Sequence, residues 1–166
     1  MKMTPGKYRG FQRLADANGT MKMLAADQRG PILGPIAKAR GVDVAPHDDV
    51  ARFKELLVRH LSAQSSAVLI DPIYAFPDTV PLIGRDPALM ITVEHSFVEE
   101  TPLGKKSLNI PGWSVEKARR AGGDAAKILV WYRADLDESI REHQRAYVRA
   151  TGEACRKADI VHLLEL

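Results

Sequence analysis

Lys127 is the residue whose setting most strongly indicates chemistry, because it lies inside an apolar run from position 125 to 132. An ammonium group among aliphatic side chains loses most of its hydration, so it needs a charged partner, a polar pocket or a lowered pKa. A lysine in such a setting can polarise a carbonyl, hold a phosphate or form a Schiff base. The alternative is a structural lysine whose ammonium reaches solvent where the chain enters the strand.

Acidic residues lie where predicted strands end: Asp27, Asp71, Glu94 and Glu165. In parallel α/β barrels the active site is built at these strand ends, although such acids also cap turns and helices. Asp27 and Glu165 are the stronger catalytic candidates, since a carboxylate facing a barrel lysine forms the pair that proton transfer at a carbonyl requires. Asp71 precedes Pro72 and is the most typical of a simple turn.

The sequence shows no pattern for a metal or a cofactor. The histidines, at positions 47, 60, 95, 143 and 162, and the one cysteine do not have the spacing of a zinc site. We therefore expect no metal ligands and no cofactor. Cys155 has no base beside it in sequence, so we expect a buried structural thiol.

Five short apolar segments predict the buried strands that would position these groups, at 21–26, 67–70, 89–93, 125–132 and 161–166. Apolar residues at helical spacing predict helices over about 48–61, 114–121 and 137–156. We expect loops at 30–46 and 97–111, which are rich in glycine, proline or polar residues, and a loop with at most a short helix at 73–86.

Strands that are apolar on both faces and alternate with helices predict a parallel sheet covered by helices. Five strands fit either an open doubly wound sheet or the first part of an eight-stranded barrel. The segment 27–31 has neither the Rossmann nor the P-loop glycine spacing, and this favours the barrel. We expect a (β/α)8 TIM barrel of which about the first five strands are present, with 1–166 as the N-terminal portion of a single domain.

Composition sets limits on the protein's partners. The chain has 166 residues, 45% hydrophobic and 27% charged, which is typical of a globular domain. Its net charge of +3 comes from scattered basic residues, so we expect no binding to nucleic acid, and an anionic small substrate is compatible with this charge. The N-terminal region has no long apolar run, and one cysteine cannot form an internal disulfide, so we expect a cytoplasmic protein that does not enter membranes.

Several segments, taken together, resemble the tagatose-bisphosphate aldolase family, whose members are class I, metal-independent aldolases on a (β/α)8 barrel. They are Lys-Met-Leu-Ala-Ala-Asp-Gln-Arg-Gly at 22–30, Leu-Ile-Asp-Pro at 69–72, Trp-Ser-Val at 113–115, Gly-Gly-Asp-Ala-Ala-Lys at 122–127, Trp-Tyr at 131–132 and Leu-Leu-Glu at 163–165. The similarity extends along essentially the whole chain in matching order. The Asp-Gln-Arg-Gly and Ala-Lys segments are specific when they occur together.

The resemblance implies retro-aldol cleavage of a ketohexose bisphosphate into dihydroxyacetone phosphate and glyceraldehyde 3-phosphate through a lysine imine. It implies that Asp27, Lys127 and Glu165 are catalytic, with Glu165 acting as acid and base in imine formation and cleavage. Gln28 and Arg29 would bind the phosphorylated sugar substrate. The family's imine-forming lysine lies on a sixth strand, and we count five, so we expect a truncated polypeptide that is inactive alone.

Three other functions remain open. A related sulfo-sugar phosphate aldolase would share the same barrel. A transaldolase-like enzyme would form its imine on the fourth strand, at Lys127. A non-catalytic half-barrel would instead form a homo-oligomer or bind a partner through its exposed fifth strand.

Overall fold

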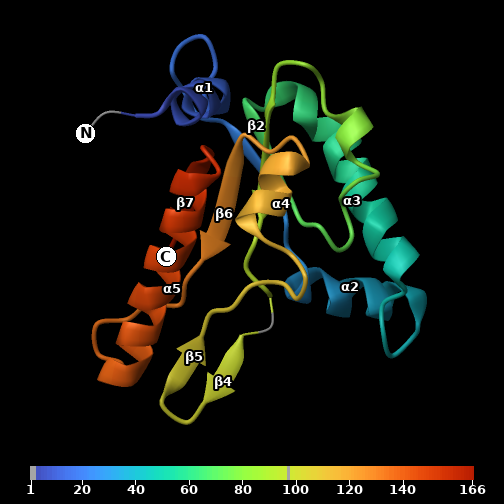
Figure 1. The fold of residues 1–166 in the computed structure, drawn as a ribbon. Coiled ribbons are helices and arrows are strands. Elements are labelled where there is room, and N and C mark those ends of the chain that lie inside the picture. Colours follow the sequence, from blue (N-terminus) through green and yellow to red (C-terminus); the bar gives the residue numbers. More distant parts are fainter. Residues whose placement is uncertain (1–2, 97) are drawn as a thin grey trace.

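A five-stranded parallel sheet forms the centre of the computed structural model, which describes residues 3–96 and 98–166 (Figure 1). Its strands are β1 (Met23–Ala26), β2 (Ala67–Ile70), β3 (Ala88–Thr92), β6 (Ala125–Leu129) and β7 (Val161–Glu165). Every neighbouring pair is parallel. The five predicted strands are confirmed, but β6 ends at Leu129, and Trp131 beyond it is half exposed.

The strand order β1-β2-β3-β6-β7 follows the chain without reversal. A doubly wound sheet reverses its strand order at a switch point, whereas a barrel adds each strand on the same side of the last. The observed order therefore favours the barrel over the doubly wound alternative.

Within the described residues no helix is long and apolar enough to cross a membrane.

The predicted helices cover one face of the sheet: α3 (His47–Leu61), α4 (Val115–Arg120) and α5 (Glu138–Lys157). Val58 of α3 packs on Val68 and Ile70, and the outward residues of β6 pack near α5 at Cys155. Alternate residues of the same strands form a second cluster on the opposite face: Ala67, Leu69, Ala88, Met90 and Ala125. Burial on both faces explains why β2, β3 and β6 read as continuous apolar runs, whereas the edge strands β1 and β7 are only partly buried. Cys155 is fully buried, as predicted.

Helix α1 (Pro5–Leu14) was not predicted, and it closes the end of the sheet at which the strands begin (Figure 1). Leu14 enters the cluster on the inner face of the sheet. The N-terminus of α1 is capped by a distant residue, because Asp159 accepts hydrogen bonds from the backbone N–H groups of Gly6 at 2.9 Å and Lys7 at 3.2 Å. A cap contributed from 150 residues away leaves no local signal.

Helix α2 (Gly30–Arg40) corrects the expectation of a loop from 30 to 46. Pro31 lies in the first turn, where a proline N–H is not needed. Pro35 lies inside the helix, and the residue before it is Gly34, which has no Cβ to clash with the proline ring. The helix ends at Gly41, whose φ of 68° is the left-handed cap that glycine favours.

A hairpin of β4 (Glu99–Thr101) and β5 (Gly104–Lys106) corrects the expectation that 97–111 is irregular; Phe97 itself lies outside the described residues. The buried side chain of Gln144 holds the hairpin, since its amide donates to the Lys105 carbonyl at 2.8 Å and accepts from the Ser107 N–H at 3.2 Å. Short 3-10 turns occur at η1 (Ser62–Gln64) and η2 (Val80–Leu82), and the latter is the short helix expected within 73–86.

Gly10 allows α1 to approach the sheet closely, and this predicts the effect of a methyl group there. A Cβ at Gly10 would lie 2.7 Å from the Asp124 carbonyl oxygen and 2.9 Å from Val161. We expect Gly10→Ala to lower the free energy of unfolding by about 1–3 kcal/mol in urea denaturation, the usual cost of overpacking.

The matched control is Gly152→Ala inside α5, where the added Cβ would meet only ordinary contacts with His162 at 3.5 Å or more. Alanine exceeds glycine in helix propensity by about 1 kcal/mol, so this variant should gain stability. If both variants gained stability, the close packing of α1 would be refuted.

Candidate active site

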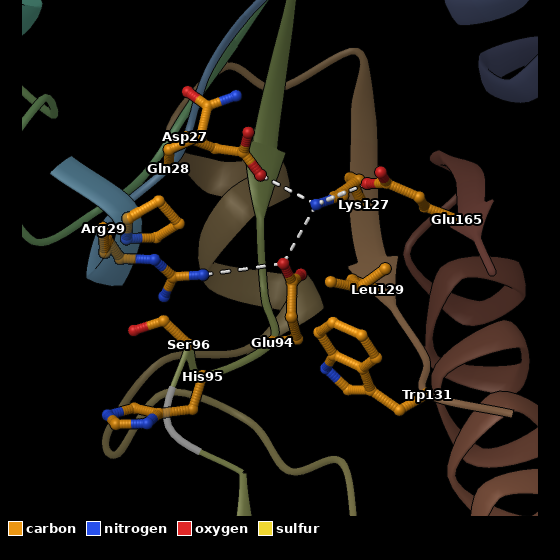
Figure 2. A pocket seen from close by; sticks show the side chains of 11 residues that line it. Asp27, Gln28, Arg29, Glu94, His95, Ser96, Lys127, Leu129, Trp131 and Glu165 are labelled. Atoms are coloured by element: carbon orange, nitrogen blue, oxygen red, sulfur yellow. Dashed lines mark hydrogen bonds and ion pairs between the residues drawn. The ribbon is translucent and has the colours of Figure 1, made fainter.

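The C-terminal edge of the sheet gathers side chains from four strands (Figure 2). Asp27 directly follows β1, Glu94 lies two residues beyond the end of β3, Lys127 is the third residue of β6, and Glu165 ends β7. In the sheet register Lys127 pairs with Leu163, two positions before Glu165. Because side chains alternate between faces, Lys127 and Glu165 share one face of the sheet.

The ammonium group of Lys127 lies among three carboxylates. Its Nζ is 2.8 Å from Asp27 Oδ2, 3.0 Å from Glu94 Oε1 and 3.0 Å from Glu165 Oε2. An ammonium has three N–H donors, so these three oxygens satisfy it. The structure thus brings together the three predicted catalytic residues and adds Glu94.

These carboxylates determine the charge state of Lys127, which is 4% exposed. Burial alone would favour the neutral amine, but the negative charges of Glu94 and Asp27 outweigh it and raise the pKa of Lys127 well above its ordinary range. Lys127 is therefore an ammonium at neutral pH. A Schiff base forms on a free amine, so this geometry suits a lysine that orients substrate and stabilises negative charge.

Glu94 is the central residue that the sequence ranked below Asp27 and Glu165. Thr92 donates a short hydrogen bond to its carboxylate, and Arg29 Nη2 lies 3.5 Å from Oε1. Burial raises the pKa of Glu94 above its ordinary value, although the charge of Lys127 opposes this. A buried carboxyl group with a raised pKa is suited to proton transfer. In the sequence, the available signal for Glu94 was its position two residues after Thr92, a spacing that places both side chains on the same face of an extended chain.

Arg29 has hydrogen-bonding capacity that the protein does not use. Its side chain is 4% exposed, and its Nε and Nη1 atoms are buried without a hydrogen-bond partner in the described part of the chain. Buried guanidinium donors are normally paired, and carboxylate or phosphate oxygens are their preferred acceptors. Arg29 thus could bind an anionic group of a ligand.

These groups line a cavity of about 200 Å³ (Figure 2). Its lining residues are Asp27, Gln28, Arg29, Pro31, Glu94, His95, Ser96, Lys127, Leu129, Trp131 and Glu165. All five residues predicted to form the site lie here, with Gln28 and Glu165 exposed and the other three buried. Leu129 and Trp131 add an apolar wall, so the cavity suits a small polar molecule with a hydrocarbon backbone.

Asp71 lies apart from this cavity and forms a buried ion pair with Lys54, whose Nζ is 2.6 Å from Asp71 Oδ2. It also makes the turn that its sequence predicted, since Oδ1 accepts from the N–H groups of Ile73 and Tyr74. In residues 3–96 and 98–166 no group of three or more histidine, cysteine, aspartate or glutamate side chains could hold a metal ion. The cation among the three carboxylates is an ammonium group.

Comparison with known proteins identifies the family. A family model described as DeoC/LacD family aldolase matches residues 21–166. The chain belongs to this aldolase family. A tagatose 1,6-diphosphate aldolase of Listeria monocytogenes (strain HCC23) is 34% identical over 99% of the chain and 48% of its own length. Tagatose 1,6-diphosphate aldolase 2 of Enterococcus faecalis is 30% identical over the whole chain and 49% of its own length. The chain spans about half the length of these relatives.

Solved structures confirm the TIM-barrel fold of this family member. A fructose-bisphosphate aldolase of Plasmodium falciparum superposes with a TM-score of 0.68 at 16% identity, over 99% of this chain and 53% of that one. An archaeal fructose 1,6-bisphosphate aldolase gives a TM-score of 0.54, also at 16% identity, over 95% and 56%. The five strands therefore form part of a (β/α)8 barrel.

The raised pKa of Glu94 predicts how stability depends on pH. The folded state retains a proton on Glu94 above pH 4.5, where the unfolded chain has released it. The contribution of Glu94 is therefore complete below about pH 4.5 and is lost as pH rises through the raised pKa. We expect the stability of the wild type relative to Glu94→Gln, measured by urea unfolding, to fall as pH rises from 4.5 towards neutrality.

The control is Glu116→Gln, which removes the same charge from an exposed position on α4. Its stability difference should change far less over this pH range. A rise in the relative stability of the wild type over Glu94→Gln would show that the pKa of Glu94 is lowered instead.

Proposed function

We propose that this chain forms part of the active site of a class I aldolase that cleaves a ketohexose bisphosphate, such as tagatose 1,6-bisphosphate, into dihydroxyacetone phosphate and glyceraldehyde 3-phosphate. The observation that carries the proposal is the buried ammonium of Lys127, held by carboxylates from three other strands at the C-terminal edge of a barrel sheet. Membership of an aldolase family and the names of its relatives support the substrate class.

The residues divide the chemistry between them. Retro-aldol cleavage needs a base that takes the proton of the hydroxyl β to the carbonyl, and a group that accepts the electrons of the broken carbon–carbon bond. Asp27 and Glu94 adjoin Lys127 and can exchange protons with a substrate hydroxyl, while the ammonium stabilises the oxygen as negative charge develops. Glu165 is exposed at the edge of the cavity and serves as acid and base in forming and breaking an imine.

We assign the imine itself to a lysine outside these five strands. The family resemblance implies a nucleophile on a sixth strand, and Lys127 has its three donors occupied and its pKa raised. On this proposal residues 1–166 bind the substrate but do not cleave it alone. The same geometry disfavours a transaldolase-like imine on Lys127.

Arg29 supplies the anion contact, with Gln28 beside it as a further substrate contact. The unpaired Nε and Nη1 of Arg29 suit a phosphate oxygen. A sulfonate oxygen would be accepted in the same way, so a sulfo-sugar phosphate remains the second candidate substrate.

Binding of dihydroxyacetone phosphate to the 166-residue chain tests the proposal. We expect Arg29→Met to weaken binding about 10- to 100-fold in isothermal titration calorimetry, because charge-assisted hydrogen bonds contribute about 1.5–3 kcal/mol. The decrease should become smaller at high salt.

Arg9→Met is the matched control, because it removes the same charge from an exposed residue of α1 at the opposite end of the sheet. Equal weakening by both variants would indicate a general charge effect and contradict a phosphate contact at Arg29. Failure of the unmodified chain to bind the phosphate ester would contradict the proposed function.

A further inference from the structure

A second buried lysine, Lys54 of helix α3, lies behind the site and is 1% exposed. Its Nζ lies 2.6 Å from the backbone oxygens of Ala26 and Gln28 and 2.6 Å from Asp71 Oδ2. The two backbone oxygens accept hydrogen bonds from Lys54, and Asp71 Oδ2 lies beside the ammonium as an ion-pair partner without a hydrogen bond. Lys54 does not line the cavity.

The two carbonyl groups that Lys54 binds flank Asp27. Pairing between β1 and β2 ends with Ala26 opposite Ile70, so the backbone that carries Asp27 and Arg29 continues beyond the sheet ladder. Lys54 holds this backbone from the helix side just where strand pairing stops. It therefore restrains the segment that brings Asp27 to Lys127 at 2.8 Å and Arg29 to Glu94 at 3.5 Å.

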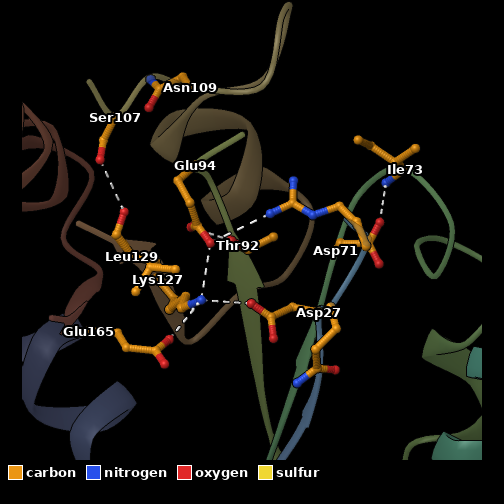
Figure 3. A network of polar contacts seen from close by, with 12 residues as sticks. Asp27, Asp71, Ile73, Thr92, Glu94, Ser107, Asn109, Lys127, Leu129 and Glu165 are labelled. Carbon is orange, nitrogen blue, oxygen red and sulfur yellow. Dashed lines mark hydrogen bonds and ion pairs between the residues drawn. The ribbon is translucent and has the colours of Figure 1, made fainter. Parts of the chain in front are cut away.

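Asp71 fixes the ammonium of Lys54 in turn. Its Oδ1 accepts from the N–H groups of Ile73 at 2.9 Å and Tyr74 at 2.8 Å, so the carboxylate is part of the turn after β2 (Figure 3). The end of β1, the end of β2 and helix α3 are thus joined through one ion pair.

Stability is a poor explanation for this arrangement. Burial lowers the pKa of Lys54, and the charge of Asp71 offsets this only in part. Buried ion pairs commonly contribute no more stability than well-packed apolar side chains of similar volume. Orientation of the two backbone carbonyls, in contrast, requires a donor at this position.

We propose that Lys54 is a positioning residue, which sets Asp27 and Arg29 in their working places against Lys127 and Glu94 without touching the substrate. The role rests on the proposed function, because a working place has meaning only for that site. The contact it controls, between Asp27 and Lys127, can be measured without any substrate.

The test is the reactivity of Lys127 towards a water-soluble acetylating reagent, followed by mass spectrometry of the full 166-residue chain and normalised to the exposed Lys157. Lys54→Met keeps the length of the side chain and removes its donors. Release of Asp27 removes a carboxylate partner from Lys127, which exposes more free amine. We expect acetylation of Lys127 to become roughly tenfold faster, corresponding to a shift of about one pKa unit.

Val58→Ala on the same helix is the control, because Val58 is fully buried in the core and has no part in these ion pairs. It should lower stability and leave the reactivity of Lys127 unchanged under conditions in which both variants are folded. Lys54→Arg, which restores donors, should recover part of the protection.

Should Lys54→Met fail to fold, Asp71→Asn removes the charge that holds Lys54 and keeps the turn acceptor, so it should accelerate acetylation in the same direction. The proposal would be overturned if every folded variant at Lys54 and Asp71 showed the same Lys127 reactivity as the Val58→Ala control. If the unmodified chain did not bind a sugar phosphate, the proposed function would be contradicted. The effect of the Lys54 and Asp71 variants on the acetylation of Lys127 would still stand.

Discussion

The burial of one positive charge is the constraint on which this site depends. Lys127 lies on β6, whose neighbouring residues pack into apolar clusters on both faces of the sheet. An unpaired ammonium there would carry a large desolvation cost. Carboxylates from three other strands compensate for it, and each must reach the same point at the C-terminal edge of the sheet. The lysine therefore sets the chemistry of the cavity, and the register of β6 and β7 places Glu165 on the face where Lys127 needs it.

The fold separates this charged cluster from the parts that provide stability. Helix α1 covers the end where the strands begin, and apolar side chains fill the inner face above it. The polar groups occupy the opposite end, where strand ends and loops can carry functional side chains without interrupting the core. Lys54 and Asp71 then join helix α3 to this end, so that the segment after β1 is held where backbone pairing stops.

Local sequence predicted the elements that carry their own signal. The continuous apolar runs revealed five strands, and Ser114 at the start of α4 caps it as a serine should, accepting from the N–H of Lys117. Two of the missed elements depend on distant partners, since Asp159 caps α1 and Gln144 holds the β4–β5 hairpin. Helix α2 was missed for a local reason, because its glycines and prolines are typical of a loop, yet Gly34 makes Pro35 tolerable inside the helix. At the site, Lys127, Asp27 and Glu165 were predicted as catalytic, whereas Glu94 was recognised only as a strand-end acid, because its contacts with Lys127 and Arg29 form only in the folded chain.

The charge state of Lys127 tests the account most directly. Nitrogen-15 NMR of the lysine side chains, with the Lys127 signal assigned by comparison with a Lys127→Arg variant, reports whether Nζ is an ammonium or a free amine. The account predicts that Lys127 remains an ammonium across the whole neutral and mildly alkaline range in which the protein stays folded, because carboxylates raise its pKa. A Lys127 signal that titrates to the free amine near neutral pH would contradict it, and would leave Lys127 available as a nucleophile.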